Sequence, residues 1–272
     1  MLQLGEGMKL AGYPSTQLAG NRTAGGAVRF WEVDALRGVA FLLMVVYHAA
    51  FDLAAFGGWP IAVTVGGWRM FADFIASLFL FVSGVSLVLA HQRLGSDPVR
   101  YRRHLVRRFS RLAAAALLVT VVTWFVSPAD VVLFGILHLI LVSNLVSLPL
   151  LRLREWNLLI AGAAAVLGFF LGRLPDNPWL FWLGLVPEGY RSFDFRPLFP
   201  WLAFVLLGVS FGVWFYGRGV RRWRLPEAAT LPGTGLLVWL GRHSLLLYLV
   251  HQPVLIVLLT AIGAIDLQRL IG

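Results

Sequence analysis

The sequence of 272 residues contains no cysteine and few charged residues. Without cysteine the chain can form neither disulfides nor thiolate metal sites, and it can offer no cysteine nucleophile. Charged residues make up 13% of the chain against 59% hydrophobic residues, and the mean hydropathy is +0.79. A soluble domain of this composition would leave far too much apolar surface in water. The composition therefore predicts an all-α, polytopic transmembrane helix bundle.

Acidic residues are also scarce, because 13 Asp and Glu stand against 23 Lys and Arg. Such a balance can indicate a nucleic-acid binder, but here the basic residues are confined to short stretches between apolar runs. That distribution is typical of cytoplasmic loops in membrane proteins. We therefore expect the lipid bilayer as a partner and no nucleic acid, with a homodimer as one possible assembly.

The first 28 residues lack the apolar core that a secretory signal needs. They contain Gly, Ser and Thr, and we expect residues 1–28 to form a disordered cytoplasmic tail and residues 29–272 to form a single transmembrane domain. The sequence shows neither an internal repeat nor a second domain.

Apolar runs bounded by Pro, Gly and charged residues divide the rest of the chain. We expect seven spans, at about 35–56, 69–91, 109–126, 131–151, 156–172, 198–216 and 235–262. Residues 173–197 contain four prolines among aromatic and charged residues, and we expect a long structured loop there.

Arginine is concentrated on alternate connections between these spans. Seven arginines lie in 91–111, two in 152–154 and four in 218–224, whereas 57–68 and 127–130 hold none. By the positive-inside rule, the N-terminus is cytoplasmic and the C-terminus external. We expect a multi-pass protein of the bacterial inner membrane.

Two histidines are predicted to lie deep in the outer half of the bundle. His48 follows Arg37 by eleven residues, which at ~1.5 Å per residue places it roughly 16 Å into a core of about 30 Å. Asp52 lies one turn further on the same face and could orient the imidazole. His138 follows Asp130 by eight residues, at a comparable depth. Ionisable residues inside spans usually face the bundle interior and mark function, although each histidine alone could be structural.

The last predicted span contains a third histidine, His251, beside Gln252 and Pro253. The proline frees a backbone carbonyl for a partner. The shared depth of these polar residues indicates a polar cavity.

A second constellation lies on the cytoplasmic side. Topology alone accounts for most cytoplasmic arginines, but Arg37, Arg111 and Arg242 lie inside an apolar run or at its edge. The planar guanidinium is suited to binding phosphate. We therefore expect a phosphate-bearing ligand such as a coenzyme A thioester, held by Arg37, Arg108, Arg111 and Arg242.

An ordered set of motifs runs through the chain: Arg29–Ala40 (RFWEVDALRGVA), Met44–His48 (MVVYH), Phe79–Ser86 (FLFVSGVS), Phe134–His138 (FGILH), Pro197–Trp201 (PLFPW), Leu240–Ser244 (LGRHS) and His251–Pro253 (HQP). With these motifs the chain resembles the bacterial branch of the heparan-α-glucosaminide N-acetyltransferase catalytic-domain family, over about residues 29–260. It is more loosely similar to membrane acyltransferases that O-acetylate cell-surface sugars, whose Asp-x-x-Arg, histidine and Arg-x-x-Arg motifs correspond to Asp34/Arg37, His48 and Arg108/Arg111.

The resemblance implies transfer of an acetyl group from cytosolic acetyl-CoA to an acceptor on the far side of the membrane. The acceptor would be an amino or hydroxyl group of a cell-envelope sugar. Animal members of the family place their catalytic histidine before the second helix, but this chain has no histidine between Ala49 and Ala90. That difference argues against a heparan-type substrate, and it leaves His48, assisted by Asp52, and His138 as the candidate catalytic residues.

A histidine suits this chemistry. Acyl transfer needs a base for the acceptor proton or a nucleophile that carries the acetyl group, and a neutral imidazole can do both near pH 7. No metal is required. A transporter or flippase is the alternative, because it would also use buried His and Asp, but such proteins usually show repeated halves. A non-catalytic scaffold would need no buried ionisable cluster at matched depth.

Overall fold

The computed structural model describes residues 21–22, 28–217, 220–223, 225 and 232–266. In this part of the chain the helices are α1 Trp31–Gly57, α2 Gly66–Leu94, α3 Pro98–Val126, α4 Ile136–Leu150, α5 Asn157–Leu171, α6 Leu198–Phe215, α7 Thr234–Arg242 and α8 Ser244–Ala261. Three short 3-10 helices are η2 Pro128–Asp130, η3 Leu151–Trp156 and η4 Phe181–Leu183. The strands β1 Asn21–Arg22 and β2 Val28–Arg29 form one antiparallel pair.

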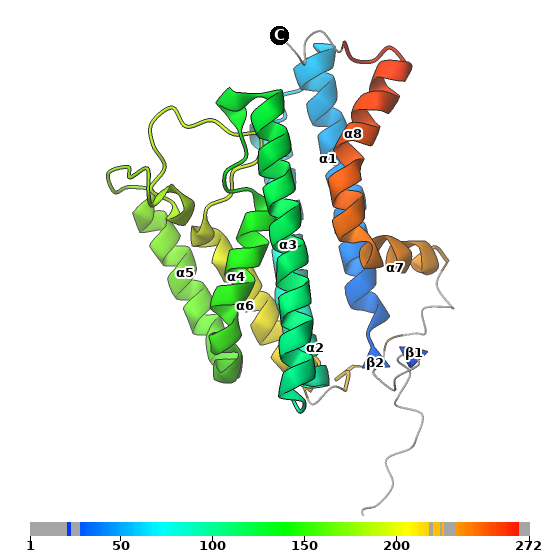
Figure 1. The fold of residues 1–272 in the computed structure, drawn as a ribbon, viewed down its shortest axis with the longest axis vertical. Helices are drawn as coiled ribbons and strands as arrows, with labels where there is room; N and C mark the ends of the chain where they lie inside the picture. Colours follow the sequence, from blue (N-terminus) through cyan, green and yellow to red (C-terminus); the bar gives the residue numbers. More distant parts are fainter. Residues whose placement is uncertain (1–20, 23–27, 218–219, 224, 226–231, 267–272) are drawn as a thin grey trace, which may run out of the picture.

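Six helical stretches among the described residues are long and apolar enough to cross a membrane. One of them, Ile136–Leu171, combines α4 and α5, which are separated by η3. The chain reverses there, since Arg154 has a φ of 51° and the Asn157 side chain donates to the carbonyls of Leu150 and Arg154. In Figure 1, α4 and α5 lie as two separate rods. Counting them separately gives seven crossings, so the fold class is confirmed: the chain is a multi-pass integral membrane protein.

Several boundaries differ from the expected spans. The fourth span begins at Ile136, not at 131, because the Asp194 carboxylate accepts the Ile136 backbone N–H at 2.7 Å and starts the helix there. The third helix starts at Pro98, well before 109. Asp97 caps its N-terminus and Pro98 suits its first turn. Hydropathy alone missed this polar extension of the helix.

The expected last span, 235–262, is two helices. α7 ends at Arg242 and lies nearly perpendicular to α8, beside α1, while α8 runs along the bundle (Figure 1). His243 lies at the joint, where its backbone N–H donates to the carbonyls of Trp239 and Leu240. The shorter α7 is amphipathic, which suits a helix at the membrane surface.

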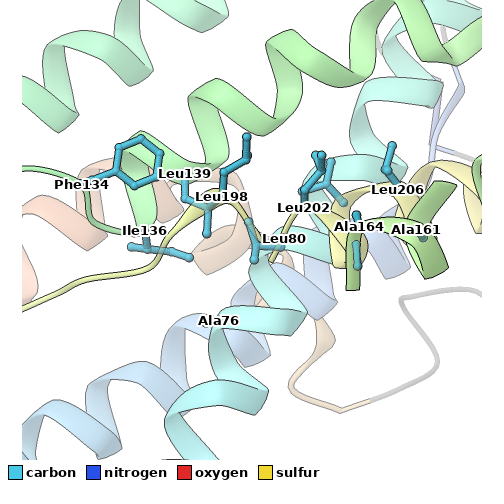
Figure 2. Packing of buried hydrophobic residues seen from close by; sticks show 12 residues of the cluster. Ala76, Leu80, Phe134, Ile136, Leu139, Ala161, Ala164, Leu198, Leu202 and Leu206 are labelled. Atoms are coloured by element: carbon cyan, nitrogen blue, oxygen red, sulfur yellow. The ribbon is translucent and has the colours of Figure 1, made fainter. Parts of the chain in front are cut away.

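The core forms where α6 packs against α2, α4 and α5. Leu80, Leu139 and Leu206 are fully buried there, and Figure 2 shows them with their neighbours. Gly84 of α2 and Gly208 of α6 let the two backbones touch, because a Cβ on either would collide with a carbonyl oxygen of the other helix. This contact fixes α2, and with it one wall of the site described below.

The N-terminus of α1, the α2–α3 connection, η3 and α7 lie at the same end of the bundle (Figure 1). This end carries the arginine-rich connections, so the positive-inside rule predicts that it faces the cytoplasm. Most of the tail predicted for residues 1–28 lies outside the described residues.

Candidate functional site

A cavity of about 720 Å³ opens in the arginine-rich half of the bundle, between α1, α2, α3, α4, α7 and α8. Small-molecule sites in proteins are usually clefts of roughly 300–1,000 Å³. All four arginines predicted to bind the ligand line it: Arg37, Arg108, Arg111 and Arg242. The structure therefore brings together side chains from three helices that are far apart in the sequence.

One carboxylate organises the arginines of α1 and α7. Asp34 is buried, and its oxygens accept from Arg29 at 2.7 Å, from Arg37 at 3.1 Å and from Arg242 at 3.5 Å. Arg37 also donates to the Ser86 hydroxyl at 2.6 Å. Three guanidinium groups on one carboxylate leave an excess of positive charge, and Asp34 is the one acid among the described residues that line the cavity. The cavity is therefore suited to an anionic ligand.

Two glycines allow this arrangement. A Cβ on Gly241 would collide with the carbonyl oxygen of Asp34, and a Cβ on Gly38 would collide with that of Leu237. The backbones of α1 and α7 therefore touch, which places the arginine beside each glycine at the same point of the cavity wall. In the sequence the only sign of this contact is that each glycine is adjacent to an arginine.

Arg108 of α3 is held by neutral groups. Its Nη2 donates to the Ser83 hydroxyl at 3.2 Å and to Asn144 Oδ1 at 3.4 Å. Asn144 is fully buried and also donates to Ser83. These partners fix the guanidinium without neutralising its charge, so the charge is available to a ligand. Arg111, about one turn further along α3, is exposed on the same wall. Sequence reasoning missed Ser83 and Asn144, whose only signal is that they are polar residues within apolar runs.

Tyr248 of α8 connects the cavity to the deeper histidines. It lines the cavity together with Ile136 and Ile140 of α4. Its ring lies 5.5 Å from the ring of His251, and its carbonyl oxygen accepts from His251 Nδ1 at 2.6 Å. Sequence reasoning also missed this tyrosine, because nothing in an apolar run separates a site tyrosine from a packing one.

The expected polar cluster in the outer half is formed by α1 and α8. The His48 ring lies 4.9 Å from the His251 ring. Asp52 is fully buried. Its Oδ1 accepts from Gln252 Nε2 at 2.6 Å, and its Oδ2 has no hydrogen-bond partner among the described residues. The structure thus bonds Asp52 to Gln252 and places His48 against His251. In the part of the chain that was searched, no group of three or more His, Cys, Asp or Glu side chains could hold a metal ion.

His138 lies apart from this cluster, in the first turn of α4. Its Nδ1 accepts the Gly135 backbone N–H at 3.3 Å, and its Nε2 lies 3.3 Å from the Thr120 hydroxyl. That hydroxyl donates to the Val132 carbonyl at 2.6 Å, so His138 Nε2 acts as the donor toward Thr120. Both ring nitrogens are therefore engaged. The depth expected from Asp130 assumed a continuous helix, which is wrong, because residues 131–135 are irregular.

Asp194, in the loop before α6, lies beside the start of α4. Burial raises the pKa of its carboxyl group, while the Ile136 N–H and the nearby Arg196 oppose that shift. Arg196 itself pairs with Asp73 of α2.

Comparison with known proteins gives one match. The model of the family described as heparan-alpha-glucosaminide N-acetyltransferase, catalytic, matches residues 29–253. No curated protein and no solved structure matches the chain. The matched range includes both the arginine-lined cavity and the polar residues of α1 and α8, and it implies a membrane acetyltransferase that uses an acetyl donor as co-substrate. The chain belongs to the family of heparan-alpha-glucosaminide N-acetyltransferase catalytic domains.

Proposed function

We propose that this protein transfers an acetyl group from cytosolic acetyl-CoA to an amino or hydroxyl group of a cell-envelope sugar, across the bacterial inner membrane. The observation that carries the proposal is the arginine-lined cavity at the basic end of the bundle, in which Asp34 partly balances the positive charge. A ligand that enters there from the cytoplasm must be anionic, and coenzyme A carries its phosphates at one end and its thioester at the other.

The four arginines Arg37, Arg108, Arg111 and Arg242 would hold the phosphates through charge-assisted hydrogen bonds. The apolar side chains Ile136, Leu137 and Ile140 line the α4 wall of the same cavity and would enclose the uncharged arm of the donor. The thioester would then lie near Tyr248, which separates the cavity from the histidines.

We further propose His48 as the group that accepts the proton of the acceptor, or that carries the acetyl unit briefly. Asp52 lies one turn further along the same helix. His138 is the other candidate for the reactive imidazole, but each of its ring nitrogens already has a partner. The ring of His48 lies against the ring of His251 instead, and we therefore favour His48 over His138 as the reactive imidazole.

Binding of radiolabelled acetyl-CoA to the purified protein in lipid nanodiscs tests the donor half of the proposal. We expect saturable binding that unlabelled CoA displaces, and that pantetheine at the same concentration does not, because pantetheine lacks the phosphates. Failure to bind acetyl-CoA, or displacement by pantetheine as readily as by CoA, would contradict the arginine site. Transfer of label to glucosamine, chosen because the family name refers to a glucosaminide, tests the acceptor half.

A further inference from the structure

His251 has one engaged and one unengaged ring nitrogen. The side chain is 8% exposed, and Nδ1 lies 2.6 Å from the Tyr248 carbonyl oxygen. A carbonyl oxygen can only accept, so Nδ1 carries the proton and Nε2 of the neutral ring presents a lone pair. Nε2 is buried and has no hydrogen-bond partner among the described residues. A buried acceptor without a donor costs free energy, so a purely structural side chain at this place would be better apolar.

The nearest polar ring is that of His48. The two ring centroids are 4.9 Å apart with an interplanar angle of 66°. The ring centroid of Phe41 lies 6.4 Å from that of His251, so an apolar side chain also borders the His251 ring. Asp52, the residue expected to orient His48, instead accepts from Gln252. His251 is therefore the residue placed to do so.

We propose that His251 is the positioning residue of the reactive centre: its Nε2 accepts the ring N–H of His48 and keeps the other nitrogen of His48 unprotonated toward the acceptor group. The Tyr248 carbonyl fixes His251, and His251 in turn fixes His48, in the way that an orienting partner selects the tautomer of a catalytic histidine. This inference rests on the proposed acetyl transfer.

The step balances with the groups named. The free nitrogen of His48 takes the proton from the acceptor N–H or O–H as the acceptor heteroatom bonds to the acetyl carbonyl carbon. The C–S bond of acetyl-CoA then breaks, and its electron pair leaves on sulfur as the CoA thiolate. The proton on His48 passes to that thiolate, which regenerates the neutral imidazole. His251 keeps its own proton on Nδ1 throughout.

Two substitutions of one residue separate positioning from packing. His251→Gln keeps a side-chain carbonyl oxygen that can accept from His48, whereas His251→Leu keeps the bulk and loses the acceptor. The full chain in nanodiscs is assayed for acetyl-CoA affinity and for release of CoA thiol, with glucosamine and with water as acceptors. We expect His251→Leu to lower kcat by about 10- to 100-fold, as loss of an orienting partner does elsewhere. His251→Gln should recover a large part of that loss, and the Kd for acetyl-CoA should stay within about twofold of the parent in both.

Parental kcat in His251→Leu would overturn the inference, and so would equal losses in the two variants, because then the acceptor atom would not matter. A parent that binds acetyl-CoA but releases no thiol with either acceptor would also contradict it while leaving the donor site intact. Absence of acetyl-CoA binding in the parent would instead remove the proposed function, so the two failures are told apart by the binding measurement.

Discussion

The arginine-lined cavity and the His48 cluster differ in charge although α1 contributes to both. At the cytoplasmic end, Asp34 joins arginines of α1 and α7 around an open cavity. Eleven residues beyond Arg37 on α1, the ring of His48 lies against the ring of His251 of α8. The difference follows from the depth of the two regions in the membrane. Guanidinium groups are stable near the helix ends, where water reaches them, whereas deep in the membrane a neutral imidazole costs less free energy to bury than a charged group. In the proposed function, anion binding and proton transfer therefore occupy different levels of α1.

The largest effect is expected from a substitution that changes the His48 cluster and leaves the arginine-lined cavity intact. His48→Ala should lower turnover by about 10²- to 10⁴-fold, the usual contribution of a general base, and should leave acetyl-CoA binding unchanged because His48 is not part of the cavity wall. Turnover and equilibrium binding, measured on the same preparation, check this. Full turnover in His48→Ala combined with its loss in His138→Ala would move the reactive group to α4.

The next largest effect is expected from substitutions in the arginine-lined cavity that leave the His48 cluster intact. Arg111→Ala should weaken acetyl-CoA binding by about 1.5–3 kcal/mol, roughly 10- to 150-fold, through loss of a charge-assisted contact. Arg102→Ala is the matched control, since Arg102 is exposed on the same helix and does not line the cavity. Equal affinity in the parent and both variants would argue against phosphate binding on α3. Arg37→Ala should lose both affinity and thermal stability, because Arg37 also bonds Asp34 and Ser86.

A third substitution tests whether the close backbone contact between α1 and α7 holds the arginines of the cavity in place. Gly241→Ala places a methyl group against the Asp34 carbonyl, so α7 must move from α1, at a cost of about 1–3 kcal/mol. We expect a lower Tm and weaker acetyl-CoA binding. Gly235→Ala, on the same helix in open space, should be neutral or stabilising by up to about 1 kcal/mol. Identical behaviour of the two variants would show that the close contact of α1 and α7 does not hold the arginines.

The smallest expected effect lies outside both regions. Burial raises the pKa of Asp194 above its ordinary value of 3.8, so the folded chain holds this proton more tightly than the unfolded chain. The resulting stabilisation is complete below the ordinary pKa and is lost as pH rises through the raised one. Asp194→Asn keeps an oxygen for the Ile136 N–H but does not titrate. The variant should therefore gain Tm relative to the parent as pH rises above 3.8, the ordinary pKa of the carboxyl group. A difference that stays constant as pH rises would contradict the raised pKa.

Composition and hydropathy predicted the helical membrane bundle, because that fold class depends on sums over long segments. The end of a helix depends on single contacts instead. Ile136 begins α4 because Asp194, 58 residues away, bonds its N–H, and no local pattern contains that partner. The break between α7 and α8 was also missed, although the polar residues Arg242, His243 and Ser244 interrupt the apolar run there.

The sequence indicated which residues belong to the candidate site, but it did not indicate which of them contact one another. Arginines at the edges of apolar runs indicated the cavity, and the structure brings them together. The i, i+4 spacing of His48 and Asp52 suggested that the two would interact, but helix spacing says nothing about the facing helix. The facing helix is α8, which supplies Gln252 to Asp52 and His251 to His48. Tyr248 gave no signal, because only the three-dimensional arrangement places it between the two regions.

The side from which acetyl-CoA binds tests the central claim most directly. Radiolabelled acetyl-CoA is added to sealed vesicles that contain the full chain in either orientation, with the orientation established by protease access to a terminal tag. We predict saturable binding only where the arginine-rich end faces the outside of the vesicle, and loss of that binding in Arg111→Ala. Equal binding in both orientations, or binding only where the opposite end is exposed, would contradict a donor site in the cytoplasmic cavity.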